Sequence, residues 1–269
     1  MKKTIFSLFL LILSGCNSDD VSESSNQIES FLKSRVYLNL PSNAPNRDEF
    51  YEYESGLLKS ATGFTHLLGN YTYNNGKLIS MNNSFEQYTY QYDQNGRLTR
   101  RLETGTNNYI ELFYQNNKVI THRYYEFGGS QSRLEQRELL LDNQGRIIQM
   151  IDLAQDQSAI DIEYETYEYD NNGNISKRTS KYLNNPQEVV TNYTYESIKN
   201  PYYNSFKEYY KLTYYLDFFL GLIIYNDYGL TPNLIQSSSS TYETNNFNYP
   251  TKENKQSNGD TFEIIYEYE

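Results

Sequence analysis

The chain has 269 residues, and its 30 Tyr and 13 Phe argue against a disordered polymer, since each of these rings can bury a large area. It carries 23 Lys and Arg against 34 Asp and Glu, and removing residues 1–15 with their two lysines leaves 21 against 34, a formal charge of −13. A surface of this sign repels phosphate backbones and anionic lipid headgroups, so we expect no nucleic-acid partner.

The first element is a secretory signal over residues 1–15. Lys2 and Lys3 form a basic head, and the apolar run 5–13 is too short to cross a ~30 Å hydrocarbon layer as a helix. The next residues, Leu13-Ser14-Gly15-Cys16, resemble the lipobox of bacterial lipoproteins. That resemblance implies diacylation of the Cys16 thiol and a mature chain beginning at Cys16, held to the membrane by its acyl chains.

Residues 16–34 are expected to form a lipidated flexible tether, because they are polar and low in complexity. Cys16 is the single cysteine, so the fold must do without an internal disulfide. The acidic residues that follow it, Asp19 and Asp20, resemble the surface-export signal of Bacteroidota lipoproteins; a plain solvated linker is the alternative. We therefore expect an outer-membrane lipoprotein, and the choice of membrane leaflet stays open.

The main domain, expected over 35–269, repeats one short motif. "YTYQYDQNGRLTR" from Tyr88 alternates aromatic and polar residues, turns at Asn-Gly and resumes with a cation and a leucine. Related copies have turns marked by Gly56, Gly76, Gly96, Asn117, Gly145 and Gly173, at spacings of 20, 20, 21, 28 and 28 residues. Each copy reads as one β-hairpin. The predicted fold is all-β, an antiparallel meander forming a strongly curved or barrel-like sheet.

The lengths of the loops predict the pairing register. Two-residue loops at Ser55-Gly56, Asn75-Gly76 and Asn116-Asn117 require positive φ, and three-residue loops place Gly in the left-handed region. Counting outward from these loops gives six cross-strand pairs of an aromatic or Leu with an aliphatic residue: Tyr53 with Leu58, Tyr73 with Leu78, Tyr92 with Leu98, Tyr114 with Val119, Leu141 with Ile147, and Tyr169 with Ile175. The opposite face is polar, with Phe113 and Leu140 as exceptions.

The repeat resembles the YD (Rhs-type) repeat, with its core Tyr-Asp-x-x-Gly-Arg-Leu. Residues Tyr92 to Leu98 match that core throughout, and the copy from Tyr169 to Ile175 departs at Asn174, where a cation is expected. The combination of lipobox, degenerate YD hairpins and the C-terminal "YPTK" at Tyr249 resembles functionally uncharacterised Bacteroidota lipoproteins. This resemblance implies a curved antiparallel sheet and supplies no activity.

One segment breaks the repeat. Between residues 204 and 223, apolar residues recur at helical spacing, with Ser205 as a candidate cap and Gly221 as a candidate end, which predicts a helical insertion near 204–221. Its expected role is to cover the apolar face or plug the mouth of a barrel. A partner- or ligand-binding insertion is the alternative.

Motifs for chemistry are scarce. The turns at Asp93 and Asp170 superficially resemble calcium loops but lack the bidentate Glu, and Asp and Asn stabilise turns by themselves. His66 and His122 lie in strand-like stretches away from a nucleophile elbow. We therefore expect no metal, no cofactor and no catalytic residue.

The preferred interpretation is a lipid-anchored, non-enzymatic binding or structural module, with a glycan or another envelope protein as partner. Two alternatives stay open: a hydrolase acting on glycans through an unassigned carboxylate pair, and a solute-binding protein with a Tyr-lined cavity. Tyrosines of the repeat could stack against sugars, and the candidate ligand face comprises Tyr71, Tyr73, Tyr90, Tyr92, Tyr167 and Tyr169.

Overall fold

The computed structural model describes residues 31–40, 44–65, 67–153, 162–183, 185–219, 231–257 and 259–269. The expected signal segment and the tether up to residue 30, with Cys16, lie outside these ranges, as do His66 and Gly221. Within them, no helix is both long and apolar enough to span a bilayer. The β domain begins at Leu32 rather than at residue 35, so the last three residues assigned to the tether belong to a strand.

Seventeen strands form one antiparallel sheet. Pairing ladders join each strand from β1 to β14 to the next along the chain. The first seven are β1 (Leu32–Leu38), β2 (Glu49–Glu54), β3 (Leu57–Gly63), β4 (Gly69–Asn74), β5 (Lys77–Asn82), β6 (Gln87–Tyr92) and β7 (Leu98–Glu103). The next seven are β8 (Tyr109–Gln115), β9 (Lys118–Phe127), β10 (Ser130–Leu141), β11 (Ile147–Asp152), β12 (Ile162–Tyr169), β13 (Ile175–Tyr182) and β14 (Glu188–Asn192). The predicted meander is confirmed.

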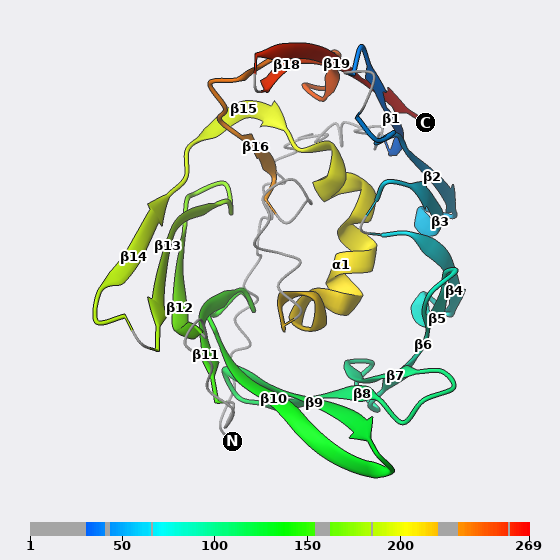
Figure 1. Ribbon diagram of the computed structural model, residues 1–269, viewed down its shortest axis with the longest axis vertical. Coiled ribbons are helices and arrows are strands. Elements are labelled where there is room, and N and C mark those ends of the chain that lie inside the picture. Colours follow the sequence, from blue (N-terminus) through cyan, green and yellow to red (C-terminus); the bar gives the residue numbers. More distant parts are fainter. Residues whose placement is uncertain are drawn as a thin grey trace, which may run out of the picture.

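The sheet curves into a ring, because its last strands pair with its first. A second run of ladders joins β17 (Ser240–Thr244), β18 (Pro250–Ser257) and β19 (Asp260–Tyr268), and β19 pairs with β1. Between β14 and β17 the chain forms a separate two-stranded sheet of β15 (Tyr195–Lys199) and β16 (Asn233–Ile235), and helix α1 (Pro201–Phe219) crosses the inside of the ring (Figure 1).

All six predicted cross-strand pairs occur in the register given by the loops. In five of these hairpins a one-residue irregularity follows the pair, so one residue, such as Lys59 or Ile79, has no residue opposite it in the ladder. Such bulges increase local twist and help a sheet to curve. The loop lengths therefore predicted correctly which side chains share a face of the sheet, but the bulges were not predicted.

The turns behave as expected with one exception. Ser55 and Gly56 have φ of 53° and 75°, Asn75 and Gly76 behave alike, and the Gly of each three-residue loop is left-handed, as at Gly96 with φ 78°. The pair Asn116-Asn117 forms a two-residue loop but does not adopt positive φ. The positive φ expected there was wrong, and this hairpin is also the one without an irregularity in its ladder.

In several copies of the repeat, the tyrosine ties its hairpin to the preceding one. The hydroxyl of Tyr92 donates to the carbonyl of Leu78 at 2.7 Å, and Tyr114 donates to Leu98 at 2.8 Å. The same bond recurs around the ring, from Tyr169 to Ile147, from Tyr195 to Ile175, and from Tyr268 to Pro250. Each acceptor is the residue that follows the previous turn, so the repeat consensus encodes the contact between neighbouring hairpins.

The Asp and Arg of the consensus act within the turn. One oxygen of Asp93 accepts the backbone N–H groups of Asn95 and Arg97, and the other accepts the Arg97 side chain. The Arg97 guanidinium then lies 4.4 Å from the ring centre of Tyr114 in the next hairpin. Asp142 and Arg146 repeat this geometry. The acids of the supposed calcium loops therefore serve as turn acceptors.

Helix α1 covers the apolar face of the ring. It begins at Pro201, not near 204, and its cap is Asn200, whose side chain accepts the N–H of Tyr202 at 3.0 Å. The expected cap, Ser205, lies within the helix and accepts the N–H of Leu32 at 2.6 Å. Pro at the first helical position suits its fixed φ and missing N–H. Phe206 is fully buried, with its ring 4.9 Å from that of Tyr51.

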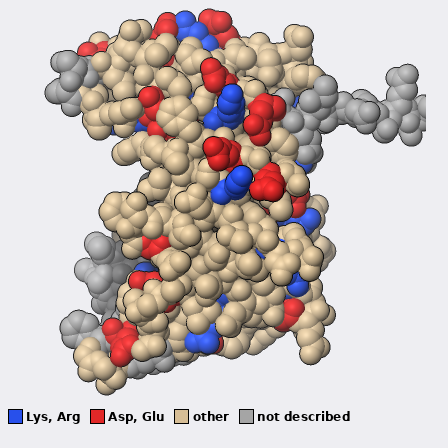
Figure 2. All heavy atoms as spheres, turned by 90° about the vertical axis from the view of Figure 1, so that its right-hand side faces the viewer, with Lys and Arg blue, Asp and Glu red and all other residues tan. Residues whose placement is uncertain are grey.

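The outer face of the ring is polar and charged. Cross-strand ion pairs join neighbouring strands, among them Lys118–Glu138 at 2.6 Å and Lys252–Glu263 at 2.7 Å. Figure 2 shows acidic and basic side chains interspersed over one side of the molecule. The outer surface is thus one that water solvates well, while tyrosines and aliphatic residues fill the inside.

Candidate functional site

The six tyrosines proposed as a ligand face point to the inside of the ring. Tyr71, Tyr90 and Tyr167 are at most 7% exposed, and Tyr71 packs edge-on against Tyr209 of α1 at 5.4 Å. These three tyrosines belong to the buried core and offer no ligand surface. Of the half-buried members, Tyr73 and Tyr92 pack against that core, whereas Tyr169 lines a cavity.

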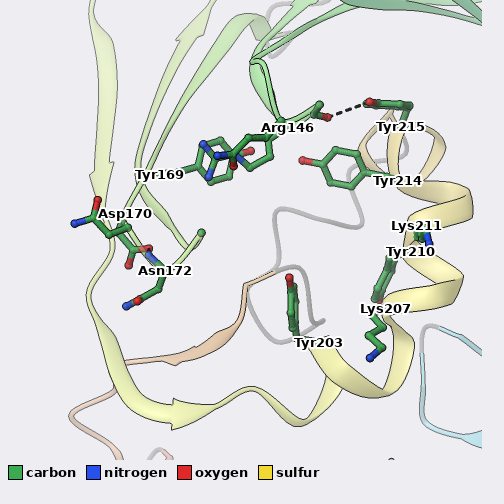
Figure 3. A pocket seen from close by; sticks show the side chains of 14 residues that line it. Arg146, Tyr169, Asp170, Asn172, Tyr203, Lys207, Tyr210, Lys211, Tyr214 and Tyr215 are labelled. Atoms are coloured by element: carbon green, nitrogen blue, oxygen red, sulfur yellow. Dashed lines mark hydrogen bonds between the residues drawn. The ribbon is translucent and has the colours of Figure 1, made fainter. Parts of the chain in front are cut away.

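This cavity has a volume of about 850 Å³ and lies between α1 and two hairpin turns. One wall consists of the β10–β11 turn with Arg146 and the β12–β13 turn with Asp170 and Asn172. The other wall is the face of α1 that turns away from β2–β5 (Figure 3). A volume of this size accommodates a small ligand such as an oligosaccharide unit.

Aromatic and basic residues alternate along the helical wall. Tyr203, Lys207, Lys211 and Tyr214 follow one another at intervals of four, four and three residues, so they share one side of the helix, with Tyr210 beside them. Tyr203 is 39% exposed, and its ring stands in the cavity opposite Asp170 and Asn172 (Figure 3). The helix thus has two functions by face, one packing against the core and one lining the cavity.

A second cavity of about 1060 Å³ adjoins the first and shares Asp170, Asn172 and Tyr203 with it. Its other walls come from β15, from Pro232 and Asn233 before and in β16, and from Tyr249. Asn174 holds this side in place, because its side-chain oxygen accepts the N–H of Asn233 at 3.0 Å. The departure of Asn174 from the consensus cation therefore coincides with the place where the bridging sheet meets the ring.

The polar groups of the cavity are fixed before any ligand arrives. The Tyr215 hydroxyl donates to the carbonyl of Gly145 at 3.0 Å, and Arg146 is held by Asp142 at 2.8 Å. Burial raises the pKa of Tyr214 and of Tyr215, so both hydroxyls remain protonated. For Asp170, partial burial favours the acid, but hydrogen bonds from the side chain and N–H of Asn174 outweigh it and lower the pKa.

Buried carboxylates occur elsewhere, and each is occupied by donors of the chain itself. Glu49 accepts the hydroxyls of Tyr202 at 2.6 Å and Tyr51 at 2.8 Å, and it pairs with Arg35 at 3.4 Å. Among the described residues these contacts join the start of α1 to the strands. Glu49 is not part of the walls of either cavity.

Two further buried carboxylates follow the same rule. Glu165 is fully buried and accepts Ser180 at 2.7 Å as well as Arg178 and Tyr167. Glu253 accepts Tyr266 at 2.8 Å. A buried charge held by several donors is the expected arrangement for a structural ion pair, and the walls of the two cavities include neither residue.

The remaining candidate for chemistry in the described residues is a histidine of the sheet. His122 lies half-buried on β9, with its Nδ1 3.2 Å from the hydroxyl of Tyr124 and its ring against Phe113. Within the part of the chain that the structure describes, no group of three or more His, Cys, Asp or Glu side chains could hold a metal ion.

Sequence reasoning missed the cavity but not every part of it. The helical segment was recognised, and the two lysines, Lys207 and Lys211, among its tyrosines were a signal that part of this face is not core. Asn172, Asn233 and Tyr249 come from segments distant in sequence. Their meeting depends on the curvature of the ring, which a repeat pattern does not specify.

Comparisons with known proteins assign no role to these residues. No family model and no curated protein matches the chain. Among solved structures, a porin-like protein from Bacteroides vulgatus ATCC 8482 is similar at 12% identity and a TM-score of 0.42, over 89% of this chain and 99% of that one.

Proposed function

We propose that the protein is a lipid-anchored envelope protein that binds a hydroxyl-rich ligand, such as a glycan, and does not catalyse a reaction. The observation that carries this proposal is the cavity beside α1, which combines an exposed ring at Tyr203 with amides and a carboxylate at Asn172 and Asp170. Aromatic faces stack on the apolar face of a sugar ring, while amides and carboxylates bond its hydroxyls.

The binding chemistry of the cavity suits a neutral or polar saccharide. Its tyrosine hydroxyls can donate or accept, Asn172 can do both, and Asp170 accepts only. The buried carboxylates Glu49, Glu165 and Glu253 have internal partners, which supports a binding role over hydrolysis by a carboxylate pair.

Replacement of Tyr203 by Ala tests the binding site. Because the ring is exposed on the helix, its loss should leave the fold intact but weaken saccharide binding about tenfold, a change of ~1.4 kcal/mol. Isothermal titration with maltohexaose, cellohexaose, xylohexaose and mannohexaose provides the measurement. Phe85→Ala is the matched control, since Phe85 is 85% exposed and lies outside the cavity. Equal binding by wild type and Tyr203→Ala, or no binding of any of the four, would refute the site.

Replacement of Cys16 by Ala tests the anchor separately. Without the thiol no acyl chain can be attached, and two or more chains hold a protein at a membrane far more firmly than one. The variant should move from the membrane to the soluble fraction when cells are fractionated, whereas Ser18→Ala should not. Retention of Cys16→Ala in membranes washed with high salt would contradict acyl anchoring.

A further inference from the structure

The two rims of the ring are not equivalent. In a meander, every second connection returns to the same edge, and the tight hairpin turns β2–β3, β4–β5, β6–β7, β8–β9, β10–β11, β12–β13 and β17–β18 therefore lie together on one rim. We call it the turn rim. The connections β3–β4, β5–β6, β7–β8 and β18–β19 lie on the opposite rim.

The chain enters the ring at the turn rim. Leu32 opens β1 beside the β2–β3 turn, because its carbonyl accepts the hydroxyl of Tyr53 at 3.0 Å. The ring of Phe31 lies 5.0 Å from that of Tyr53 and would contact a side chain placed at Gly56. Everything that precedes residue 31, including the expected lipid anchor, therefore connects to the molecule at this rim.

The cavity beside α1 also belongs to the turn rim. Its walls include the tips of two of the turns, Gly145 and Asn172, and the exposed side chain of Lys211 on the helix. The point where the chain enters the ring and the cavity are thus at the same end of the molecule. The connections of the opposite rim are about 20 Å away, the length of a six-residue strand such as β7.

The length of chain outside the structure limits how far this rim can stand from the lipid. Fourteen residues lie between Cys16 and Phe31, and this connection spans at most ~50 Å when fully extended and ~20 Å on average as a random chain. A ring held by one rim on so short a connection presents that rim to the surface to which it is attached.

We infer that the turn rim faces the membrane and that the cavity takes a saccharide carried by a lipid of that membrane, as the headgroup of a glycolipid. This inference rests on the proposed function, since it requires both the anchor at Cys16 and a hydroxyl-rich ligand. A free oligosaccharide has the same chemistry, so the experiment must distinguish the two sources.

The orientation is tested with two reporters at the ends of one strand. Because Cys16 is blocked by acylation, a fluorophore can be attached to the lipidated chain at Gln94→Cys on the turn rim or at Thr104→Cys on the opposite rim; both positions are exposed. In proteoliposomes containing a lipid with a nitroxide headgroup, quenching at position 94 should exceed that at position 104 at least twofold. Equal quenching, or stronger quenching at 104, overturns the inference and leaves the saccharide-binding test of Tyr203 unaffected.

The source of the ligand is tested on the same vesicles. Gln144→Cys, at an exposed position in the lining of the cavity, should react with a maleimide reagent at least threefold more slowly when the bilayer contains a neutral diglycosyl diacylglycerol than when the same amount of its free disaccharide is added to the solution. The reaction at Gln94→Cys should be unchanged. Equal protection by the free disaccharide, or protection by neither, overturns a membrane-borne ligand, whereas binding of a soluble hexaose at Tyr203 would still support the proposed function.

Discussion

At the scale of single residues, the repeated tyrosine is a hydrogen-bond donor before it is a hydrophobic residue. Burial raises the pKa of Tyr92 to about 12, and its neutral hydroxyl donates a hydrogen bond to the carbonyl of Leu78. The neutral hydroxyl is therefore available at all physiological pH values. Its contribution to stability is complete below the unfolded pKa of ~10 and is lost as the pH rises through about 12.

The chain contains its own control for this bond. Tyr92→Phe should lower the free energy of unfolding by about 1 kcal/mol, because it leaves the carbonyl of Leu78 without its donor. Tyr73 occupies the same place in the preceding repeat, but its buried hydroxyl has no hydrogen-bond partner among the described residues. Tyr73→Phe should therefore leave stability unchanged or raise it. Urea unfolding of both variants gives the comparison, and a similar loss in both would argue against the inter-hairpin bond.

At the scale of elements, the turn acid is what makes a three-residue loop recognisable. The hydrogen bond from the backbone N–H of Arg97 has the largest effect and lowers the pKa of Asp93. Desolvation raises this pKa by less, and the Arg97 guanidinium lowers it further. One turn shows that the carboxylate charge is replaceable. At Asn245 the amide oxygen accepts the N–H groups of Phe247 and Tyr249, and Asn248 takes the left-handed position with φ 65°. Residues 245–249 are thus a further copy of the turn, which the sequence hid because it lacks both Asp and Gly.

The turn at Asn245, where an amide stands in place of the carboxylate, suggests how the contribution of the turn carboxylates to stability can be measured. The double variant Asp93→Asn and Asp142→Asn keeps the turn acceptors but removes both carboxylates, whose pKa values are lowered in the folded state. Stability from such groups is present above the unfolded pKa of ~3.9 and is lost as the pH falls through the lower folded values.

Melting temperature between pH 5 and pH 2 should therefore fall less steeply in the double variant than in wild type. Glu86→Gln with Asp260→Asn removes two exposed charges outside these turns and should follow the wild-type slope. A double variant that is as acid-sensitive as wild type would show that the turn carboxylates do not contribute.

At the scale of the whole molecule, the sequence predicts the local geometry far better than its assembly. Loop length specified which side chains face each other, because a pleated strand alternates strictly and a tight turn leaves no freedom of register. The pairing of β1 with β19 could not be predicted, since no turn connects them and both strands carry the same alternation as every other. The start of α1 was misplaced because Ser205 was taken as the cap, and the cap at Asn200 became evident only with the helix in place.

The cavities could not be predicted from the sequence, because each is a space between segments that are distant along the chain. The walls of the second cavity at Tyr203, Asn172 and Tyr249 come from three separate segments, and the distances between these segments depend on the curvature summed over many hairpins. The tyrosines that the repeat emphasises, such as Tyr90 and Tyr167, are needed for packing. A ligand surface in this architecture is therefore found on the residues that interrupt the repeat.

The pairing of β1 with β19 also bears on how the polypeptide can be made. The first strand to leave the ribosome or a translocation channel has one edge occupied early by β2, but its other partner is the last strand of the ring. Until residues 260–268 emerge, that edge is available to any other extended chain, and unpaired edges favour aggregation. Because contacts between distant segments form slowly, a helper that shields nascent β1 would increase the yield of closed rings most strongly when translation or export is slowed.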